Sequence, residues 1–200
     1  QNIAAAGEDI TIRTSLLEMR SIAGATSVSE QMLSTFKHWV ANQPAGYFVE
    51  AKLAERDQRH ARFGGTRYAV EPNVKDGKGG LRDLHTLFWI SKYAYRLDHV
   101  RGVLGAGILR ISEARAFASS QRFLWTVRCF LHQHHGREDD RLTFDAQMQL
   151  APLMGFADRS GLRGVERFMK RYYLAARQVG NLTRIFCAAL ATDFDQRPRL

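Results

Sequence analysis

The sequence is poor in cysteine and proline. Of its 200 residues, only Cys129 and Cys187 are cysteines, and only four are prolines. Two cysteines in apolar, helix-like stretches exclude a disulfide framework and predict buried, reduced thiols in a cytoplasmic protein. Because prolines are few and no Gly/Ser-rich tract occurs, long linkers and extended disorder are also excluded. One domain, or two small ones, is therefore expected.

Long apolar runs and blocks of one charge are also absent. No stretch of about 18 apolar residues occurs, so we expect no membrane-spanning helix. The N-terminus has no basic segment followed by an apolar one, which excludes a signal peptide, and its first residue, Gln1, indicates a fragment. The net charge is +9, but the basic residues are spread along the chain. This distribution favours phosphate ligands or an acidic protein partner over a nucleic-acid polymer.

What the sequence does contain is apolar residues at helical spacing. This period predicts a short helix ending near residue 20, followed by longer helices over about 27–42, 44–63, 81–96, 112–131, 142–153 and 162–191. Residues 8–13 alternate polar and apolar side chains, which predicts one short strand. Short connections favour antiparallel neighbours. We therefore expect an all-α fold, an antiparallel bundle of about six or seven helices with a short N-terminal strand.

One stretch, from Glu71 to Asp83, has no apolar period. It reads Glu-Pro-Asn-Val-Lys-Asp-Gly-Lys-Gly-Gly-Leu-Arg-Asp and leads into a predicted helix. Glycines let backbone N–H groups approach an anion, and a helix N-terminus adds partial positive charge. Lysine supplies point charges and arginine a bidentate fork. The candidate phosphate- or substrate-binding residues are Asn73, Lys75, Lys78, Gly79, Gly80, Arg82 and Asp83. The alternative is a glycine turn that only joins two helices. The loop matches neither a Walker nor a dinucleotide motif.

Other polar clusters have competing interpretations. Residues 55–62 are almost wholly polar and form either a solvated face or, through Arg59, His60 and Arg62, a wall facing the loop. The cluster at 132–141 contains residue types that suit a metal, but helix-end cations and a salt-bridge network of Arg137, Asp140 and Arg141 are favoured. Asp193 and Asp195 lack the surrounding strand that a magnesium pair needs. Asp9, on the expected strand, is unspecific by itself, and no nucleophilic triad is present.

The stretch 71–83 closely resembles the bacterial family of PII uridylyltransferase/uridylyl-removing enzymes. Residues 9–20 look like the segment that ends the nucleotidyltransferase domain of that family. Further matches to its helical region are Arg59-His60, Leu124-Trp125 with Arg128, Leu131-His132, Asp140–Asp145, Val165–Met169 and Tyr172-Tyr173. The resemblance covers most of the chain. It implies a remnant of the nucleotidyltransferase domain at 1–25, a helical domain at 26–192 and a tail at 193–200.

The family transfers UMP from UTP to a tyrosine of the PII signalling protein with Mg²⁺, and removes it when glutamine is high. The resemblance implies that Asp9 is a third catalytic, metal-binding carboxylate. From their charge and position, we expect Lys75, Arg82 and Lys78 to neutralise phosphate or to receive the acidic side of PII, with Arg59 beside them. The chain departs from the family in lacking a Gly-Ser…Asp-x-Asp motif, a His-Asp dyad and ACT-like alternation. We therefore expect a fragment that is inactive alone.

Two alternatives stay open. One is a non-catalytic helical module that docks an acidic partner or a nucleotide. The other is an adenylyltransferase-type relative acting on glutamine synthetase, whose strand motif characteristically reads Asp-Leu-Arg-Leu-Arg-Pro. The corresponding residues here read Asp9-Ile-Thr-Ile-Arg-Thr14, and the central loop favours the uridylyltransferase.

Overall fold

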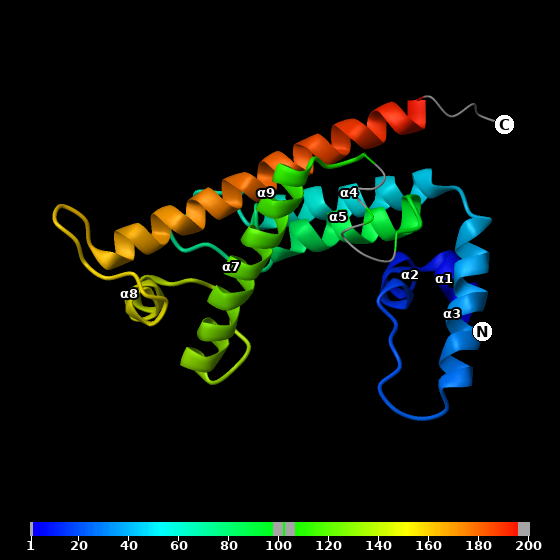
Figure 1. The fold of residues 1–200 in the computed structure, drawn as a ribbon, viewed down its shortest axis with the longest axis horizontal. Helices are drawn as coiled ribbons and strands as arrows, with labels where there is room; N and C mark the ends of the chain where they lie inside the picture. Colours follow the sequence, from blue (N-terminus) through cyan, green and yellow to red (C-terminus); the bar gives the residue numbers. More distant parts are fainter. Residues whose placement is uncertain (1, 98–101, 103–106, 196–200) are drawn as a thin grey trace.

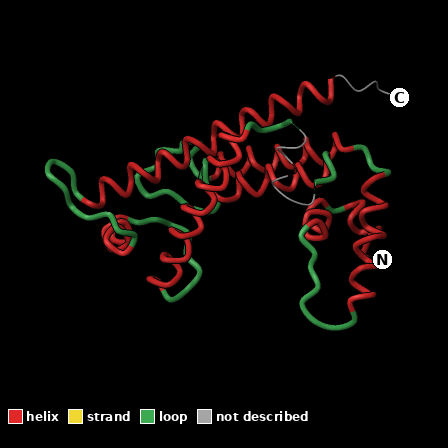
Figure 2. The backbone as a smooth tube through the Cα atoms, viewed as in Figure 1, coloured by secondary structure: helices red, strands yellow, loops and turns green. Residues whose placement is uncertain are grey.

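The computed structural model describes residues 2–97, 102 and 107–195. Within these ranges, every regular element is a helix, and the only β-type pairings are two isolated bridges (Figure 2). The helices are α1 (Asn2–Glu8), α2 (Ile10–Leu17), α3 (Thr26–Ala41), α4 (Ala45–Arg62), α5 (Leu81–Ala94), α7 (Ile111–His135), α8 (Phe144–Leu153) and α9 (Gly164–Asp195). The all-α prediction is confirmed. None of the helices described is long and apolar enough to cross a membrane.

Helices α4 and α5 form the centre of the molecule. They pack side by side and antiparallel, and the long helix α9 contacts α5, α7 and α8, with α7 crossing it steeply (Figure 1). The apolar period explains this packing, because Leu84, Leu87, Ile90 and Tyr93 form a buried stripe that winds around α5, which is surrounded by α4, α7 and α9. A second stripe on α9 is buried in the same way, with Phe168, Tyr172, Val179, Leu182 and Phe186. The loop at 71–83 enters this core at the N-terminal end of α5.

The predicted N-terminal strand is wrong, because residues 10–17 form helix α2. Asp9 is its N-cap, and the Asp9 Oδ1 atom accepts hydrogen bonds from the backbone N–H groups of Thr11 (2.6 Å) and Ile12 (3.3 Å). These bonds satisfy N–H groups that the start of a helix otherwise leaves without a partner. This capping favours a helix more strongly than the alternation of Ile10 and Ile12 favours a strand. Arg13 is buried and donates to the carbonyls of Ala6 and Gly7, at the end of α1.

Several smaller predictions also need correction. Cys129 is exposed and Cys187 is half-buried, so the expectation of two buried thiols is wrong. Helix α7 begins at Ile111 rather than at residue 112, with Arg110 as its N-cap residue, and the Glu113 carboxylate accepts a hydrogen bond from the Arg110 backbone N–H (2.7 Å). Helix α9 continues to Asp195, so residues 193–195 of the expected tail are helical. The rest of that tail, 196–200, lies outside the described residues. The domain boundaries stay predictions.

Candidate functional site

The loop from Glu71 to Asp83 is fixed against a second segment far along the chain. The backbone N–H of Val74 donates to the carbonyl of Asp140 (2.8 Å), and the N–H of Leu142 donates to the carbonyl of Pro72 (2.9 Å). Asn73 and Arg141 thereby form an isolated antiparallel bridge. Val74 and Leu142 are completely buried. The first half of the loop is therefore held by the core and has a defined position.

The glycines let the loop fold back on itself and pack against α9. Gly79 has a φ of +83°, and a Cβ atom there would lie 2.6 Å from the backbone oxygen of Ala176. The N–H groups of Gly77 and Gly80 donate to Asn73 and Gly77 carbonyls, and that of Gly79 donates to Asp83 Oδ2 (2.8 Å). These amides are engaged within the loop. Anion binding by Gly79 and Gly80 stays a prediction, and the side chains are the better-placed donors.

Asp83 ties the loop to the C-terminal end of α4. Its side chain is only 2% exposed, with Arg59 Nη2 at 2.5 Å and His60 Nε2 at 2.9 Å from its Oδ1 atom. Burial raises the pKa of Asp83, but the hydrogen bonds from His60 and the Gly79 amide, with the charge of Arg59, lower that pKa below its ordinary value overall. The prediction that the polar half of α4 faces the loop is confirmed for Arg59 and His60, whereas Arg62 is exposed.

The three cations of the loop differ in their partners. Lys75 Nζ lies 3.1 Å from Glu138 Oε1 and 3.7 Å from Asp140 Oδ2. Arg82 Nε lies 3.4 Å from Asp76 Oδ1, and the Arg82 guanidinium stacks over the ring of Trp89. Lys78 donates to the neutral carbonyl of Gly65 (3.0 Å). Lys78 is therefore the loop cation whose charge no carboxylate balances within the described residues.

A salt-bridge network is present around Asp140, but the predicted partners Arg137 and Arg141 are wrong. Arg128 Nε lies 2.6 Å and His132 Nε2 3.0 Å from Asp140 Oδ1. Burial raises the pKa of Asp140, but the hydrogen bonds from Arg128 and His132 lower it overall. Arg137 pairs instead with Asp139, and Arg141 with Glu71. No group of three metal-ligating side chains occurs in the described part of the chain, so the metal interpretation of this cluster gains no support.

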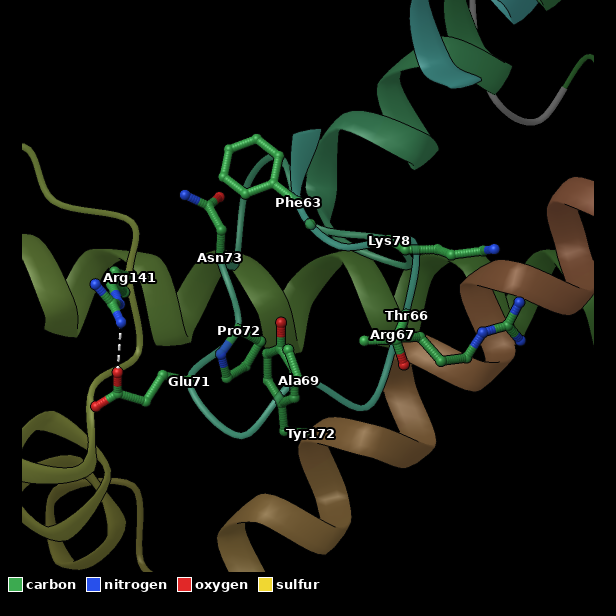
Figure 3. Close-up of a pocket in the computed structure, with 11 residues that line it drawn as sticks. Phe63, Thr66, Arg67, Ala69, Glu71, Pro72, Asn73, Lys78, Arg141 and Tyr172 are labelled. Atoms are coloured by element: carbon green, nitrogen blue, oxygen red, sulfur yellow. Dashed lines mark hydrogen bonds and ion pairs between the residues drawn. The ribbon is translucent and has the colours of Figure 1, made fainter. Parts of the chain in front are cut away.

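A cavity of about 280 Å³ opens beside the loop (Figure 3). Phe63, Pro72 and Tyr172 supply apolar walls, and Asn73, Arg67 and Lys78 supply polar ones. In Figure 3 the side chains of Arg67 and Lys78 point the same way, away from the ion pair between Glu71 and Arg141. Sequence reasoning missed Phe63 and Arg67. Their position around the helix-breaking Gly64-Gly65, next to the loop, was the available signal.

His85, one turn into α5, was also missed. Its ring lies between those of Trp89 (5.8 Å between centroids) and Trp125 (6.0 Å). Burial lowers the pKa of His85 to about 4, and the positive charges of Arg82, Arg128 and Arg59 act in the same direction. The imidazole is therefore neutral at neutral pH. A histidine flanked by tryptophan and arginine positions at helical spacing was the signal in the sequence.

Asp9 does not join this site. Helix α2 packs near the C-terminal end of α5, where Arg13 contacts Tyr93, whereas the loop enters at the N-terminal end of α5 (Figure 1). Asp9 is exposed and uses its Oδ1 atom to cap α2, and the bonds from Thr11 and Ile12 lower the pKa of its carboxyl. The structure therefore brings together Arg59, the loop residues and Asp83, but not Asp9.

The geometry can now be compared with known proteins. The sequence profile of the family described as GlnD PII-uridylyltransferase matches residues 47–187, a range that contains the loop, Asp140 and most of α4 and α9. The chain belongs to the GlnD PII-uridylyltransferase family. The resemblance inferred from residues 71–83 is thereby confirmed.

Members of the GlnD PII-uridylyltransferase family align over nearly the whole chain. Bifunctional uridylyltransferase/uridylyl-removing enzymes from Azospirillum brasilense and Rhodospirillum rubrum are each 51% identical over 96% of this chain. The one from Nitrobacter hamburgensis is 50% identical over 95%. The chain spans about a fifth of the length of these relatives, 20% in each case. No solved structure matches. An adenylyltransferase-type relative and a non-catalytic module are not favoured.

Proposed function

We propose that this chain is the helical part of a cytoplasmic bifunctional enzyme that transfers UMP from UTP to the PII signalling protein, with glutamine as effector. The observation that carries the proposal is the family match over residues 47–187, which includes the loop and every residue that holds it. The names of the relatives support uridylyl transfer and removal. The chain corresponds to a fifth of them, so the helical domain acts as a support for chemistry completed by other parts of the protein.

Within this domain, the loop cations neutralise phosphate or receive the acidic side of PII. Lys75 and Arg82 are 25% and 32% exposed, and the partners Glu138 and Asp76 are 66% and 27% exposed, whereas the second partner of Lys75, Asp140, is only 10% exposed. Exposed ion pairs contribute only about 0–1 kcal/mol each. An incoming phosphate or acidic side chain can therefore replace Glu138 or Asp76 at little cost. The buried contacts of Asp83 hold the loop in place during this exchange.

Magnesium belongs to the proposal for the whole protein, but the described residues do not form a site for it. Mg²⁺ takes oxygen ligands in octahedral geometry, usually including one or two carboxylates. Asp9 is a single exposed carboxylate engaged in capping α2, and no trio of metal-ligating side chains occurs among the residues described. We therefore derive no step through Mg²⁺ here. The catalytic role of Asp9 stays a proposal based on the family resemblance, and we infer that the isolated chain is inactive.

The test is a steady-state comparison in the intact protein. In a Lys75→Ala/Arg82→Ala variant, we expect the KM for UTP or for PII to rise at least about tenfold, because two charges opposite an anion are lost. A rise for UTP assigns the loop to phosphate, and a rise for PII assigns it to docking. The matched control is Arg122→Ala/Lys170→Ala, which removes two exposed cations from α7 and α9. Thermal unfolding verifies the fold of both variants. Kinetic constants equal to those of the control would refute the proposal.

A further inference from the structure

A second cavity, of about 290 Å³, adjoins the first between α4, the loop and α9. Both cavities are lined by Arg67 and Lys78. Arg56 and Arg184 line only the second one. We call the space around Arg56, Arg67, Lys78 and Arg184 the cationic cleft. Together the two cavities reach the volume of a small-ligand site.

Most of the charge in the cationic cleft is unbalanced. Two carboxylates also line the second cavity: Asp57, which is paired with Arg56 at 2.8 Å, and Asp83, which is already shared by Arg59 and His60. Among the described residues, Arg67 and Arg184 have neither a hydrogen bond nor an ion pair, and Lys78 donates only to the Gly65 carbonyl. Three positive charges thus line one hollow without a carboxylate of their own. Such a cleft concentrates field lines and attracts anions.

Arg67 is held in a defined place in the cationic cleft. A Cβ atom on Gly180 would lie 2.5 Å from Arg67 Nη1 and 2.7 Å from Arg67 Cζ. The guanidinium therefore rests directly on the backbone of α9, at the position that carries no side chain. Figure 3 shows the side chains of Arg67 and Lys78 extending together toward α9. The two cations are consequently arranged before any ligand arrives, which lowers the cost of ordering them.

We propose that the cationic cleft binds a polyphosphate group, at least two linked phosphates, through Arg67, Lys78 and Arg184. Guanidinium groups bind phosphate oxygens in a bidentate manner, and lysine adds a point charge. A ligand with several linked phosphates therefore matches these three cations better than a ligand with a single carboxylate does. The polyphosphate comes either from the tail of a nucleoside triphosphate or from free inorganic polyphosphate. The cleft shares Lys78 with the loop of the proposed function, but binding here requires no UMP transfer.

The test is isothermal titration calorimetry of the intact protein with inorganic tripolyphosphate. In an Arg67→Ala/Arg184→Ala variant we expect one binding site to disappear or to weaken at least about tenfold. A Gly180→Ala variant should also weaken that site, because the new methyl group displaces the Arg67 guanidinium, while its Tm holds or rises, because alanine favours helix. The control Arg115→Ala/Arg122→Ala removes two exposed arginines of α7 and should bind like the wild type.

Further arms identify the source of the phosphates. UTP and ATP binding as tightly as tripolyphosphate, with UMP much weaker, supports recognition of a nucleotide through its phosphate tail. Tripolyphosphate binding well above both nucleotides supports the free anion. Equal binding by wild type, Gly180→Ala and Arg67→Ala/Arg184→Ala would overturn the proposal, as would UMP binding more tightly than tripolyphosphate. Loss of this site can be distinguished from failure of the proposed function, which is read in KM values of the Lys75→Ala/Arg82→Ala variant.

Discussion

At the scale of single residues, Asp83 decides how the site is built. The sequence presents it as an acid among cations at the end of a glycine-rich loop. In the structure it is buried, with Arg59, His60 and the Gly79 amide around it. A buried carboxylate needs such partners, because removing a charge from water is costly. Its contribution to the site is therefore to place the loop, while the loop cations Lys75, Lys78 and Arg82 are half-buried and partly accessible to solvent.

An Asp83→Asn variant should lose about 3 kcal/mol of unfolding free energy near neutral pH, because the Arg59 guanidinium is left without its anion. The pKa of Asp83 is lowered in the fold, so its stabilisation is complete above the unfolded-state pKa of 3.8 and is lost as the pH falls below it. Urea unfolding should therefore show the two proteins converging in strong acid. The control is Asp57→Asn, because the Asp57 side chain is 65% exposed in the wild type. This substitution should change the free energy of unfolding by less than about 0.5 kcal/mol. A loss at Asp83 no greater than this would contradict the assigned role.

Residue types were readable from the sequence at this scale, but their partners were not. Arg59, Lys75 and Asp83 were singled out from charge and position. The pairing of Lys75 with Glu138 and Asp140 joins residues more than sixty positions apart, and no local pattern reports it. Phe63 and Arg67 line the cavity because Gly64 and Gly65 end α4 and turn the chain back toward α9. That direction depends on tertiary packing.

At the scale of elements, the unit formed by α4, the loop and α5 is the one on which the site depends. Apolar periodicity predicted both helices and the break between them, because their buried stripes are long and regular. The same reasoning failed at 8–13, where alternation of only two isoleucines competed with an Asp that caps a helix. In so short a segment, the alternation of apolar residues is too weak a signal to decide between a strand and a capped helix. Long helices with buried stripes do not have this problem.

Alanine substitutions at two glycines of this unit distinguish the stability cost of backbone strain from the cost of disturbing close packing. Gly65 and Gly79 both have positive φ, +65° and +83°, but a Cβ atom on Gly65 meets nothing within 4 Å, whereas one on Gly79 meets the backbone of Ala176 at 2.6 Å. Gly65→Ala should therefore cost about 1 kcal/mol, from strain alone. Gly79→Ala should cost at least about 2 kcal/mol more, because α9 has to move away from the loop. Chemical denaturation measures both, and equal losses would show that the loop does not rest on α9 as described.

At the scale of the whole molecule, the chain is a helical scaffold that presents one charged loop. The central helices bury their stripes against α9 and α7, and the loop is closed from the side by the segment around Asp140. The fold class could be predicted from the sequence, because helical periodicity is spread over most of the chain. The cationic cleft could not, because it brings residues 56–83, from the end of α4 and the loop, together with residues 180–187 of α9, far along the chain.

We propose that the loop and its surroundings contact the phosphates of the nucleotide in the intact protein. Hydrogen–deuterium exchange with and without UTP and Mg²⁺ tests it most directly, since it reads the backbone of each segment without any substitution. We predict slower exchange with ligand in peptides that cover 63–83, and no change in peptides that cover α3, on the far side of α2 and α5 from the loop (Figure 1). Unchanged exchange over 63–83 at saturating UTP would contradict the account.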